Sequence, residues 1–214
     1  FFRRTVAIGS ALSLFSAITP VAFAQPLPAG SACPVVTGKP YRTPAASTVY
    51  VVTNDCRKRP IFNPDVYFSH FDSWNKVIFV ETWQLDPVQN HALNFLPWGP
   101  RRVFASGSLV KTVDDPRVYL ILGQKAYSIE NEQAFRNFGF AFNQIEDVDP
   151  TVLAGFSKVS QPLRTVNDAP AGLAFKYASD SKVYFLNQEN GALVKSHIST
   201  YEDLKRAYRA DRLA

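Results

Sequence analysis

Three stretches of the chain alternate apolar and polar residues with a period of two, the pattern of half-buried β-strands. A turn interrupts each stretch, so each predicts a β-hairpin. At Gly123-Gln124 the turn has two residues, and a glycine in its first position favours type II′. In the third hairpin we expect a longer polar turn that ends at Gly191. The predicted strand pairs are 48–52 with 57–61, 117–122 with 125–129, and 182–186 with 192–198.

Downstream of each hairpin the apolar spacing becomes that of a helix. A residue with a short polar side chain precedes it, and that side chain can accept a hydrogen bond from a free N–H group of the first helical turn. These residues are Asn63, Asn131 and Thr200. Apolar anchors four residues later and about one further turn on predict an inward-facing stripe. The anchors are Tyr67 and Phe71, Phe135 and Phe138, and Leu204 and Tyr208. Return strands are predicted at 77–80 and 145–148, because Trp74-Asn-Lys-Val matches Phe142-Asn-Gln-Ile.

A spaced phrase also recurs in the three hairpins: a glycine, a basic residue four positions later, and Val-Tyr seven beyond that. Its copies are Gly38/Arg42/Val49-Tyr50, Gly107/Lys111/Val118-Tyr119 and Gly172/Lys176/Val183-Tyr184. In a repeat protein each copy is one supersecondary unit, and neighbouring units share a core. The expected fold class is therefore α+β, with three tandem β-hairpin–helix repeat units behind an N-terminal signal peptide.

The phrase divides the chain into five expected segments. They are a signal peptide at 1–24, a Pro-rich leader at 25–37, repeat unit 1 at 38–106, repeat unit 2 at 107–171 and repeat unit 3 at 172–214. Unit 1 carries an insertion-like loop at 82–102. Unit 3 ends where unit 2 begins its return strand, so we expect a truncated unit and a chain that is a fragment of a longer reading frame.

The second copy is similar to a known kind of sequence. It reads Gly-Ser-Leu-Val-Lys at 107–111, Asp-Pro-Arg-Val-Tyr-Leu-Ile-Leu-Gly-Gln-Lys-Ala-Tyr-Ser-Ile at 115–129, and Phe-Gly-Phe at 138–140. These phrases resemble the hairpin–helix repeats of exported bacterial surface proteins of uncharacterised function, and the resemblance covers about residues 38–214. It implies an envelope or extracellular setting. It implies no catalytic residue.

The N-terminus has the pattern of a secretory signal. Arg3-Arg4 precede the twenty uncharged residues 5–24, which end in Ala22-Phe23-Ala24 and predict cleavage before Gln25. An uncleaved anchor is the alternative, because twenty uncharged residues are long enough to span a bilayer. After cleavage no membrane span is expected. The predicted location is secreted or associated with the cell envelope.

Two cysteines, Cys33 and Cys56, remain after that cleavage. An even number of cysteines in an exported chain favours a disulfide, which here would tie the leader to the first hairpin. A free catalytic thiol is the alternative. It would need a neighbouring base, and the sequence suggests none.

The net charge of the chain is +5, and removal of Arg3 and Arg4 with the signal leaves +3. Arg57-Lys58-Arg59 is the densest basic run, and we expect it to form a solvated hairpin edge. Contact with an anionic envelope polymer is the alternative role of these three residues. No nucleic-acid-binding motif accompanies the charge, so nucleic acid is not an expected partner.

No known catalytic, metal-binding or cofactor-binding motif is present. The histidines, His70, His91 and His197, lack metal-ligand spacing. The acids at 114–115 and 146–149 are typical of solvated turns. We therefore expect no cofactor and no enzymatic activity.

Aromatic residues on the loop at 82–102 are the remaining candidates for ligand contact. Trp83 and Trp98 could stack on sugar rings, and the alternative is that both pack onto the sheet. The predicted function is a non-catalytic binding or spacing module, with cell-wall glycan or an anionic envelope polymer as partner. The second hypothesis is an accessory repeat region of a cell-wall hydrolase whose catalytic domain is missing from this fragment. The sequence does not indicate whether the chain has a protein partner.

Overall fold

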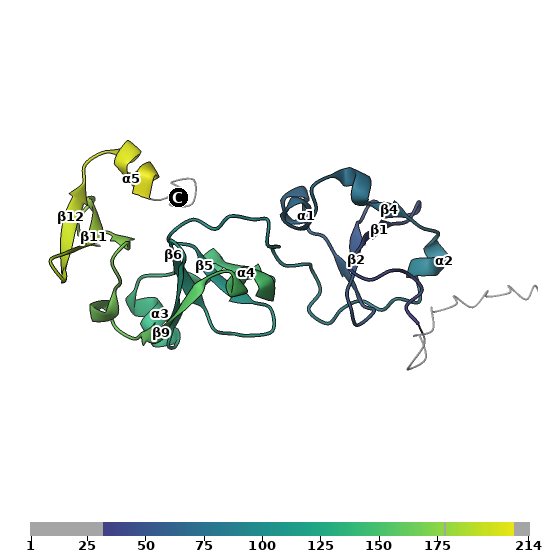
Figure 1. Ribbon diagram of the computed structural model, residues 1–214, viewed down its shortest axis with the longest axis horizontal. Coiled ribbons are helices and arrows are strands. Elements are labelled where there is room, and N and C mark those ends of the chain that lie inside the picture. The colour runs from purple at the N-terminus through teal and green to yellow at the C-terminus, as the bar shows by residue number, and fades with distance from the viewer. Residues whose placement is uncertain (1–31, 178, 208–214) are drawn as a thin grey trace, which may run out of the picture.

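The fold is α+β in the computed structural model, which describes residues 32–177 and 179–207 (Figure 1). Three β-sheets follow one another in chain order along the long axis, each with short helices. The predicted signal peptide, its cleavage site and the helix anchor Tyr208 lie outside the described residues.

The first sheet has the strand order β3-β2-β1-β4. Its strands are β1 (Pro40–Arg42), β2 (Tyr50–Val52), β3 (Lys58–Pro60) and β4 (Ile78–Phe79). The first three form an antiparallel meander, and β4 pairs in parallel with β1. The accompanying helices are α1 (Pro64–His70), the 3₁₀ turn η1 (Trp74–Lys76) and α2 (Thr82–Leu85).

The second sheet has the order β8-β5-β6-β7-β9. Its strands are β5 (Leu109–Thr112), β6 (Tyr119–Leu122), β7 (Lys125–Ile129), β8 (Ile145–Val148) and β9 (Ser157–Leu163). The meander β5-β6-β7 is again antiparallel, while β8 pairs in parallel with β5 and β9 with β7. Its helices are α3 (Glu132–Asn137), the 3₁₀ turn η2 (Phe142–Gln144) and α4 (Pro150–Ala154).

The third sheet is an antiparallel meander of order β10-β11-β12. It contains β10 (Ala174–Phe175), β11 (Val183–Glu189) and β12 (Ala192–Ile198), preceded by the 3₁₀ turn η3 (Val166–Asp168) and followed by α5 (Tyr201–Ala207). The expected long turn at Gly191 is wrong. Asn190 and Gly191 both have positive φ, 52° and 82°, so they form a two-residue turn of the type I′ kind.

A glycine in the left-handed region precedes each meander. Gly38, Gly107 and Gly172 have φ values of 73°, 90° and 96°. No atom lies within 4 Å of a Cβ built on Gly38 or Gly172, so the backbone conformation rather than crowding favours glycine there. These are the first residues of the recurring sequence phrase.

The predicted helix caps are confirmed. The side chains of Asn63 and Asn131 each accept a hydrogen bond of 2.9 Å, from the backbone N–H groups of Val66 and Ala134. The Thr200 hydroxyl accepts one of 3.1 Å from the N–H of Asp203. The return strands are confirmed as well, because β4 and β8 occupy the predicted positions.

Side chains of the second sheet are buried on both faces. All four residues of β6 are buried. Two adjacent residues of this strand, Leu120 and Ile121, point to opposite faces and belong to different hydrophobic clusters. The Leu120 cluster includes Phe135 of α3, and the Ile121 cluster includes Leu153 of α4. One helix thus covers each face, so the alternation predicted for residues 117–122 is wrong within β6, which is continuously apolar.

The insertion-like loop expected at 82–102 is instead partly regular. Helix α2 begins at Thr82, and the chain then returns to the first sheet, where Lys58 donates its N–H to Gln89 O at 2.8 Å and His91 donates to Lys58 O at 3.0 Å. In the second sheet, the segment that follows the return strand forms α4 and β9, and neither element was predicted. Helix α4 has only five residues, too short a window for helical periodicity to be recognised, and the seven residues of β9 do not alternate apolar and polar.

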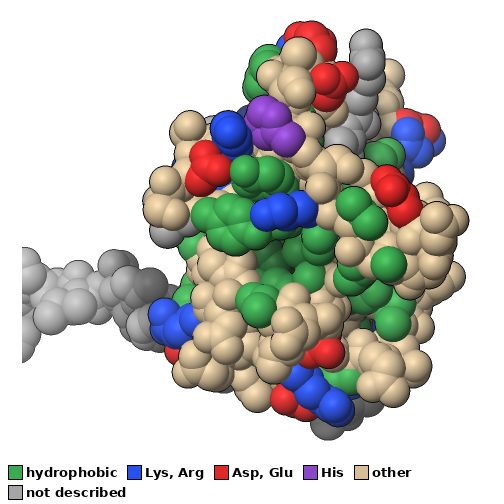
Figure 2. Space-filling view, turned by 90° about the vertical axis from the view of Figure 1, so that its left-hand side faces the viewer, with side chains coloured by type: hydrophobic (Ala, Val, Ile, Leu, Met, Phe, Trp, Pro, Cys, Tyr) green, Lys and Arg blue, Asp and Glu red, His purple; other side chains and the backbone are tan. Residues whose placement is uncertain are grey.

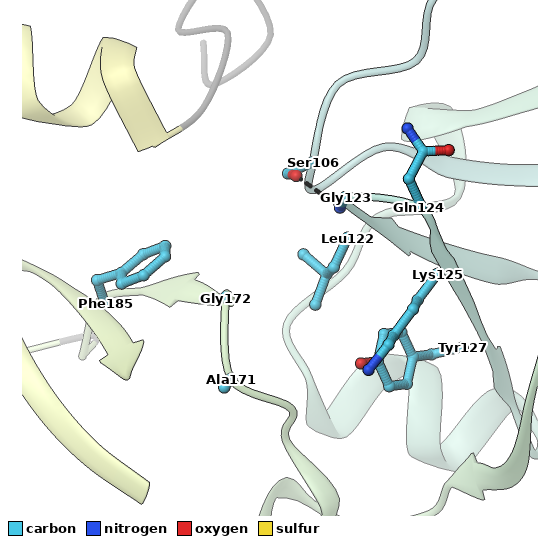
Figure 3. A pocket seen from close by; sticks show the side chains of 9 residues that line it. All are labelled: Ser106, Leu122, Gly123, Gln124, Lys125, Tyr127, Ala171, Gly172 and Phe185. Carbon is cyan, nitrogen blue, oxygen red and sulfur yellow. Dashed lines mark hydrogen bonds between the residues drawn. The ribbon is translucent and has the colours of Figure 1, made fainter. Parts of the chain in front are cut away.

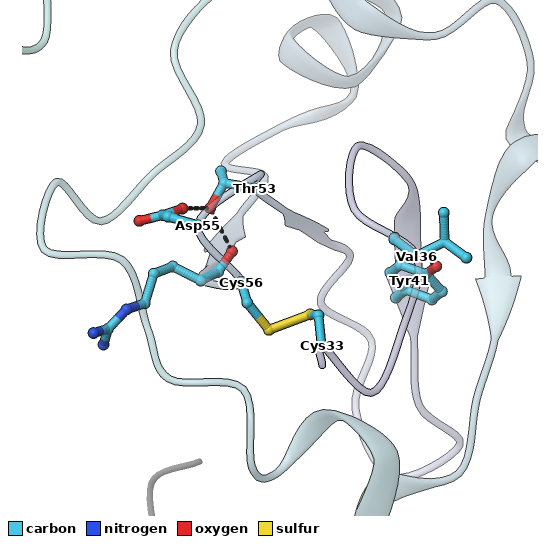
Figure 4. The surroundings of a disulfide bond; sticks show 7 residues. Cys33, Val36, Tyr41, Thr53, Asp55 and Cys56 are labelled. Atoms are coloured by element: carbon cyan, nitrogen blue, oxygen red, sulfur yellow. Dashed lines mark hydrogen bonds between the residues drawn. A yellow bond between two sulfur atoms is a disulfide. The ribbon is translucent and has the colours of Figure 1, made fainter. Parts of the chain in front are cut away.

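The disulfide predicted between Cys33 and Cys56 is confirmed, with a Cα–Cα distance of 5.6 Å (Figure 4). Cys56 lies in the turn between β2 and β3, where the Thr53 hydroxyl donates to the carbonyl oxygen of Arg57 at 2.8 Å. On the other side of the bond, Tyr41 donates its hydroxyl to Val36 O at 2.8 Å. Burial raises the pKa of Tyr41, so this hydroxyl stays a donor at neutral pH.

We expect removal of this bond to destabilise the protein by about 3 kcal/mol, because the crosslink restricts the unfolded chain. Urea unfolding of the oxidised parent and of a Cys33→Ser/Cys56→Ser variant measures the difference. A reducing agent should weaken the parent and leave the variant unchanged. Equal stability of the oxidised parent and the variant would contradict the prediction.

Candidate functional site

Trp98 joins the first two sheets. Its N–H donates to Asp147 O at 3.0 Å and its carbonyl accepts from Asp149 N at 2.8 Å, which places the residue in parallel beside Val148 of β8. The guanidinium of Arg102 lies over its ring, 3.4 Å from the centroid. The ring packs against hydrophobic clusters of both sheets and is only half-exposed. Its contacts are therefore structural.

Trp83 has a different environment. It lies on α2 with 70% of its surface exposed, and it has no ring contact with the part of the chain that is described. Since Trp98 is packed between sheets, the two tryptophans do not act as a pair. Trp83 alone presents a free indole face.

The basic run 57–59 is not the solvated edge that the sequence predicted. Arg59 is only 6% exposed, and its guanidinium donates to the carbonyl oxygens of Asn94, at 3.2 Å, and Phe95. Lys58 donates its ammonium to Leu85 O at 2.9 Å. Burial lowers the pKa of both groups. Lys58 and Arg59 therefore bond to α2 and to the segment that follows it. Arg57 is the exposed residue of the basic run.

The acids at 146–149 also have structural partners. Glu146 pairs with Arg102 at 2.6 Å, and Asp147 pairs with Lys111 at 2.5 Å. Asp149 caps α4, accepting the N–H of Thr151 at 2.9 Å. Each of these carboxylates stabilises a local contact.

His70 is the last residue of α1, and its side chain has a structural contact. Its Nε2 lies 2.8 Å from Pro97 O, so the neutral ring donates a hydrogen bond there. Burial lowers its pKa. Among residues 32–177 and 179–207, no group of three or more His, Cys, Asp and Glu side chains is placed to hold a metal ion. No helix in the same ranges is long and apolar enough to cross a membrane.

The described residues line, among others, two shallow cavities of about 350 Å³ each. The first is lined from two sheets, by Leu122, Lys125 and Tyr127 on one side and Phe185 on the other (Figure 3). Among the described residues that line it, Lys125 is the one charged side chain, so these residues offer no acid–base pair. The second is lined by Asp115 among others, which Arg117 holds by hydrogen bonds that lower the pKa of this carboxyl.

Another candidate surface is one face of the third sheet. The strand register places Phe175, Tyr184 and His197 in one cross-strand row, and Lys195 on the same face. Lys195 Nζ lies 3.3 Å from the Tyr177 hydroxyl and 5.1 Å from the centroids of the Tyr177 and Tyr184 rings. Figure 2 shows this end of the molecule, where a basic side chain lies across a hydrophobic patch with a histidine beside it.

Hydrogen bonds hold the two tyrosines in place. Tyr184 donates its hydroxyl to Asp180 at 2.9 Å, which raises the pKa of Tyr184. Phe175 stacks on the Tyr184 ring with centroids 5.7 Å apart. We call this set the tyrosine face: Phe175, Tyr177, Tyr184, Lys195 and His197.

The corresponding faces of the other sheets are covered. Tyr119 of β6 holds the position of Tyr184 but is 5% exposed, because α4 and Phe104 pack on it. In the third sheet, Tyr177, Lys195 and His197 are exposed and no residue of the tyrosine face is buried. Sequence reasoning missed this surface, although Phe175 and Tyr177 alternate as two residues of one strand face do.

In comparisons with protein-family models, curated proteins and solved structures, none matches this chain. Its function therefore has to be argued from the geometry of these surfaces.

We expect acid to destabilise the protein through His70. Its pKa in the folded state is lower than in the unfolded state, where it is about 6.5, so the unfolded state binds more protons as the pH falls through that value. Stability should fall between pH 7.5 and pH 5 by more in the parent than in His70→Gln, whose amide can still donate to Pro97. Urea unfolding at both pH values measures this. Parallel losses in the two proteins would show that His70 is not responsible.

Proposed function

We propose that the protein is an exported, non-catalytic module for binding or spacing in the cell envelope or the extracellular space. In this proposal three tandem β-hairpin–helix units follow a cleaved signal peptide. The observation that carries it is the strand arrangement: each of the three sheets contains the same antiparallel meander behind a glycine of positive φ.

Two recurring side-chain contacts support a common unit. Tyr67 stacks on Trp74 with ring centroids 4.0 Å apart, and Phe135 stacks on Phe142 at 4.7 Å. Each pair joins a helix to the 3₁₀ turn that follows it.

The second recurring contact is a lysine over the tyrosine of the Val-Tyr phrase in each sheet. The pairs are Lys58 with Tyr50 at 5.6 Å, Lys158 with Tyr119 at 5.7 Å and Lys195 with Tyr184 at 5.1 Å, each distance running from Nζ to the ring centroid. Attraction between an ammonium group and an aromatic face favours this arrangement. Lys58 and Lys195 lie on the third meander strand of their sheets, whereas Lys158 lies on β9, so the pairs in the first and third sheets support a common unit.

The arrangement along the chain supports a spacing role. The three sheets lie in a row, and the first two are joined by the Trp98 pairing rather than by a bare linker (Figure 1). A disulfide near the start of the described chain suits an oxidising compartment. Exposed Trp83 and the tyrosine face offer aromatic surface for binding.

Export can be tested with the N-terminus of the secreted protein. When the chain is produced in a bacterium that secretes it, we expect the extracytoplasmic form to begin at Gln25, because Ala22-Phe23-Ala24 has the small residues that signal peptidase requires. N-terminal sequencing measures this. Protein that stays in the cytoplasm with an uncut N-terminus would exclude the exported role.

Binding to the envelope can be tested by co-sedimentation with purified insoluble cell wall at low and high salt. We expect pelleting that survives high salt, and a loss of at least about tenfold in affinity for Trp83→Ala, because stacking on sugar rings depends little on ionic strength. Phe62→Ala is the matched control, since both aromatic side chains are 70% exposed on the first part of the molecule.

Other outcomes of the same experiment are equally informative. Pelleting that salt abolishes would point to an anionic polymer and to exposed cations such as Arg57. Equal losses in Trp83→Ala and Phe62→Ala would argue against a specific indole contact. A protein that stays in solution under all conditions would exclude wall binding.

A further inference from the structure

The second of the two cavities of about 350 Å³ lies against the second sheet. The loop between β5 and β6 bounds it on one side, and the starts of η2 and β8 bound it on the other. Its volume is at the lower end of the range for ligand sites, so it suits one short side chain or one small ring. Most of the described residues that line it are apolar: Val113, Pro116, Val118, Phe142 and Ile145.

The same position is open in the first sheet. Phe142, the first residue of η2, is 50% exposed, and its counterpart Trp74, the first residue of η1, is 46% exposed. Both sheets have a covering helix and an edge segment in place, α2 with the segment around Asn90 and α4 with β9. The position is therefore left open by a complete unit.

Three ionisable side chains line the cavity, and two of them are already paired. Lys111 Nζ lies 2.5 Å from Asp147 Oδ1, and Arg117 donates to both carboxylate oxygens of Asp115. The exposed carboxylate of Asp114 has no hydrogen bond or ion pair within the part of the chain that the structure describes. These five groups carry two positive and three negative charges, which leaves one negative charge in excess at the cavity.

The unpaired carboxylate distinguishes the second sheet from the first. Counted from the glycine of the recurring phrase, Asp114 corresponds to Ala45, and the first-sheet loop 43–49 contains no acidic residue. There the basic residue of the phrase, Arg42, donates its Nε to Ala46 O at 3.0 Å. Of these two open positions, that of the second sheet combines an apolar hollow with a carboxylate available to a ligand.

We propose that this cavity binds the side chain of a lysine-type residue in a partner peptide. The methylene groups lie in the hollow against Val118, Ile145 and Phe142, and the ammonium group pairs with the Asp114 carboxylate. Burial of the methylene groups supplies affinity, and the carboxylate supplies selectivity for a cation. The inference rests on the proposed function as a binding module, and it names an amine-bearing peptide as the ligand.

Other classes of ligand fit this cavity less well. The excess negative charge repels an anionic polymer. The Lys111 ammonium does not repel a cationic ligand strongly, because Asp147 balances its charge. An amino sugar carries its ammonium on a ring of hydroxyl groups, which would lose hydration against the apolar lining without gaining hydrogen bonds. A wholly apolar ligand would make no use of Asp114.

The experiment adds Nα-acetyl-lysine methylamide to the ¹⁵N-labelled chain Gln25–Ala214 and follows the backbone amides by NMR. We expect saturable shifts confined to residues 111–118 and 142–145. A norleucine analogue without the ammonium group and a diaminopropionic acid analogue with a shorter side chain should each bind at least about tenfold more weakly. The first lacks the charge, and the second lacks methylene groups that contribute about fourfold each when buried.

Two protein variants test the location. Asp114→Asn should weaken binding of the lysine probe at least about tenfold, and Asp65→Asn should leave it unchanged. Both substitutions replace one exposed carboxylate by an amide of similar size, and neither empties a core position. Asp65 lies in the first turn of α1, away from the residues that line the cavity. The amide spectra of the free variants check that the fold is retained.

The remaining outcomes overturn the proposal. They are absence of saturable shifts up to about 10 mM lysine probe, equal binding of the norleucine analogue, and equal effects of the two variants. Glucosamine that binds as tightly as the lysine probe at the same amides would assign the cavity to an amino sugar instead. A protein that is secreted and pellets with cell wall but does not bind the lysine probe would keep the proposed function and lose this site.

Discussion

Parallel pairing of a late strand against an early antiparallel meander is the interaction on which the first two sheets depend. A three-stranded meander has two open edges and two faces, and one helix can cover only one face. In the second sheet, β8 and β9 occupy both edges of the meander, and α4 between them covers the second face. The connection between the two edge strands contains the covering helix. The same segment therefore closes both edges of the meander and buries its second face.

This arrangement explains the composition of the strands. The four residues of β6 are buried on both faces of a five-stranded sheet, so an alternating strand would bury polar groups there. In the third sheet no strand residue is buried, and its strands are accordingly rich in polar residues such as Asn187, Gln188, Lys195 and Ser196. Strand composition and the coverage of each sheet thus agree.

The junction around Trp98 shows how one sheet is connected to the next. A single residue supplies backbone pairing to β8, a ring for the hydrophobic clusters of two sheets, and a surface for the Arg102 guanidinium. Arg102 in turn pairs with Glu146 of the same strand. A contact of this kind fixes the orientation of one sheet relative to the next, which suits a protein whose proposed role includes spacing. The third sheet, with its tyrosine face open, suits the binding part of that role.

Local chemistry could be read from the sequence because its requirements are local. Asn63 and Asn131 cap helices through bonds that reach only three residues, and Gly123 satisfies a two-residue turn whatever surrounds it. Tertiary structure alone decided which distant segments meet. Nothing near Arg59 in the chain indicates that carbonyl groups of residues 93–95 would bury it. Trp83 and Trp98 were equal candidates for ligand contact from the sequence, yet one is exposed and the other is packed between sheets. The reason is that burial and strand pairing depend on register and on the space left by other elements, which no local pattern records.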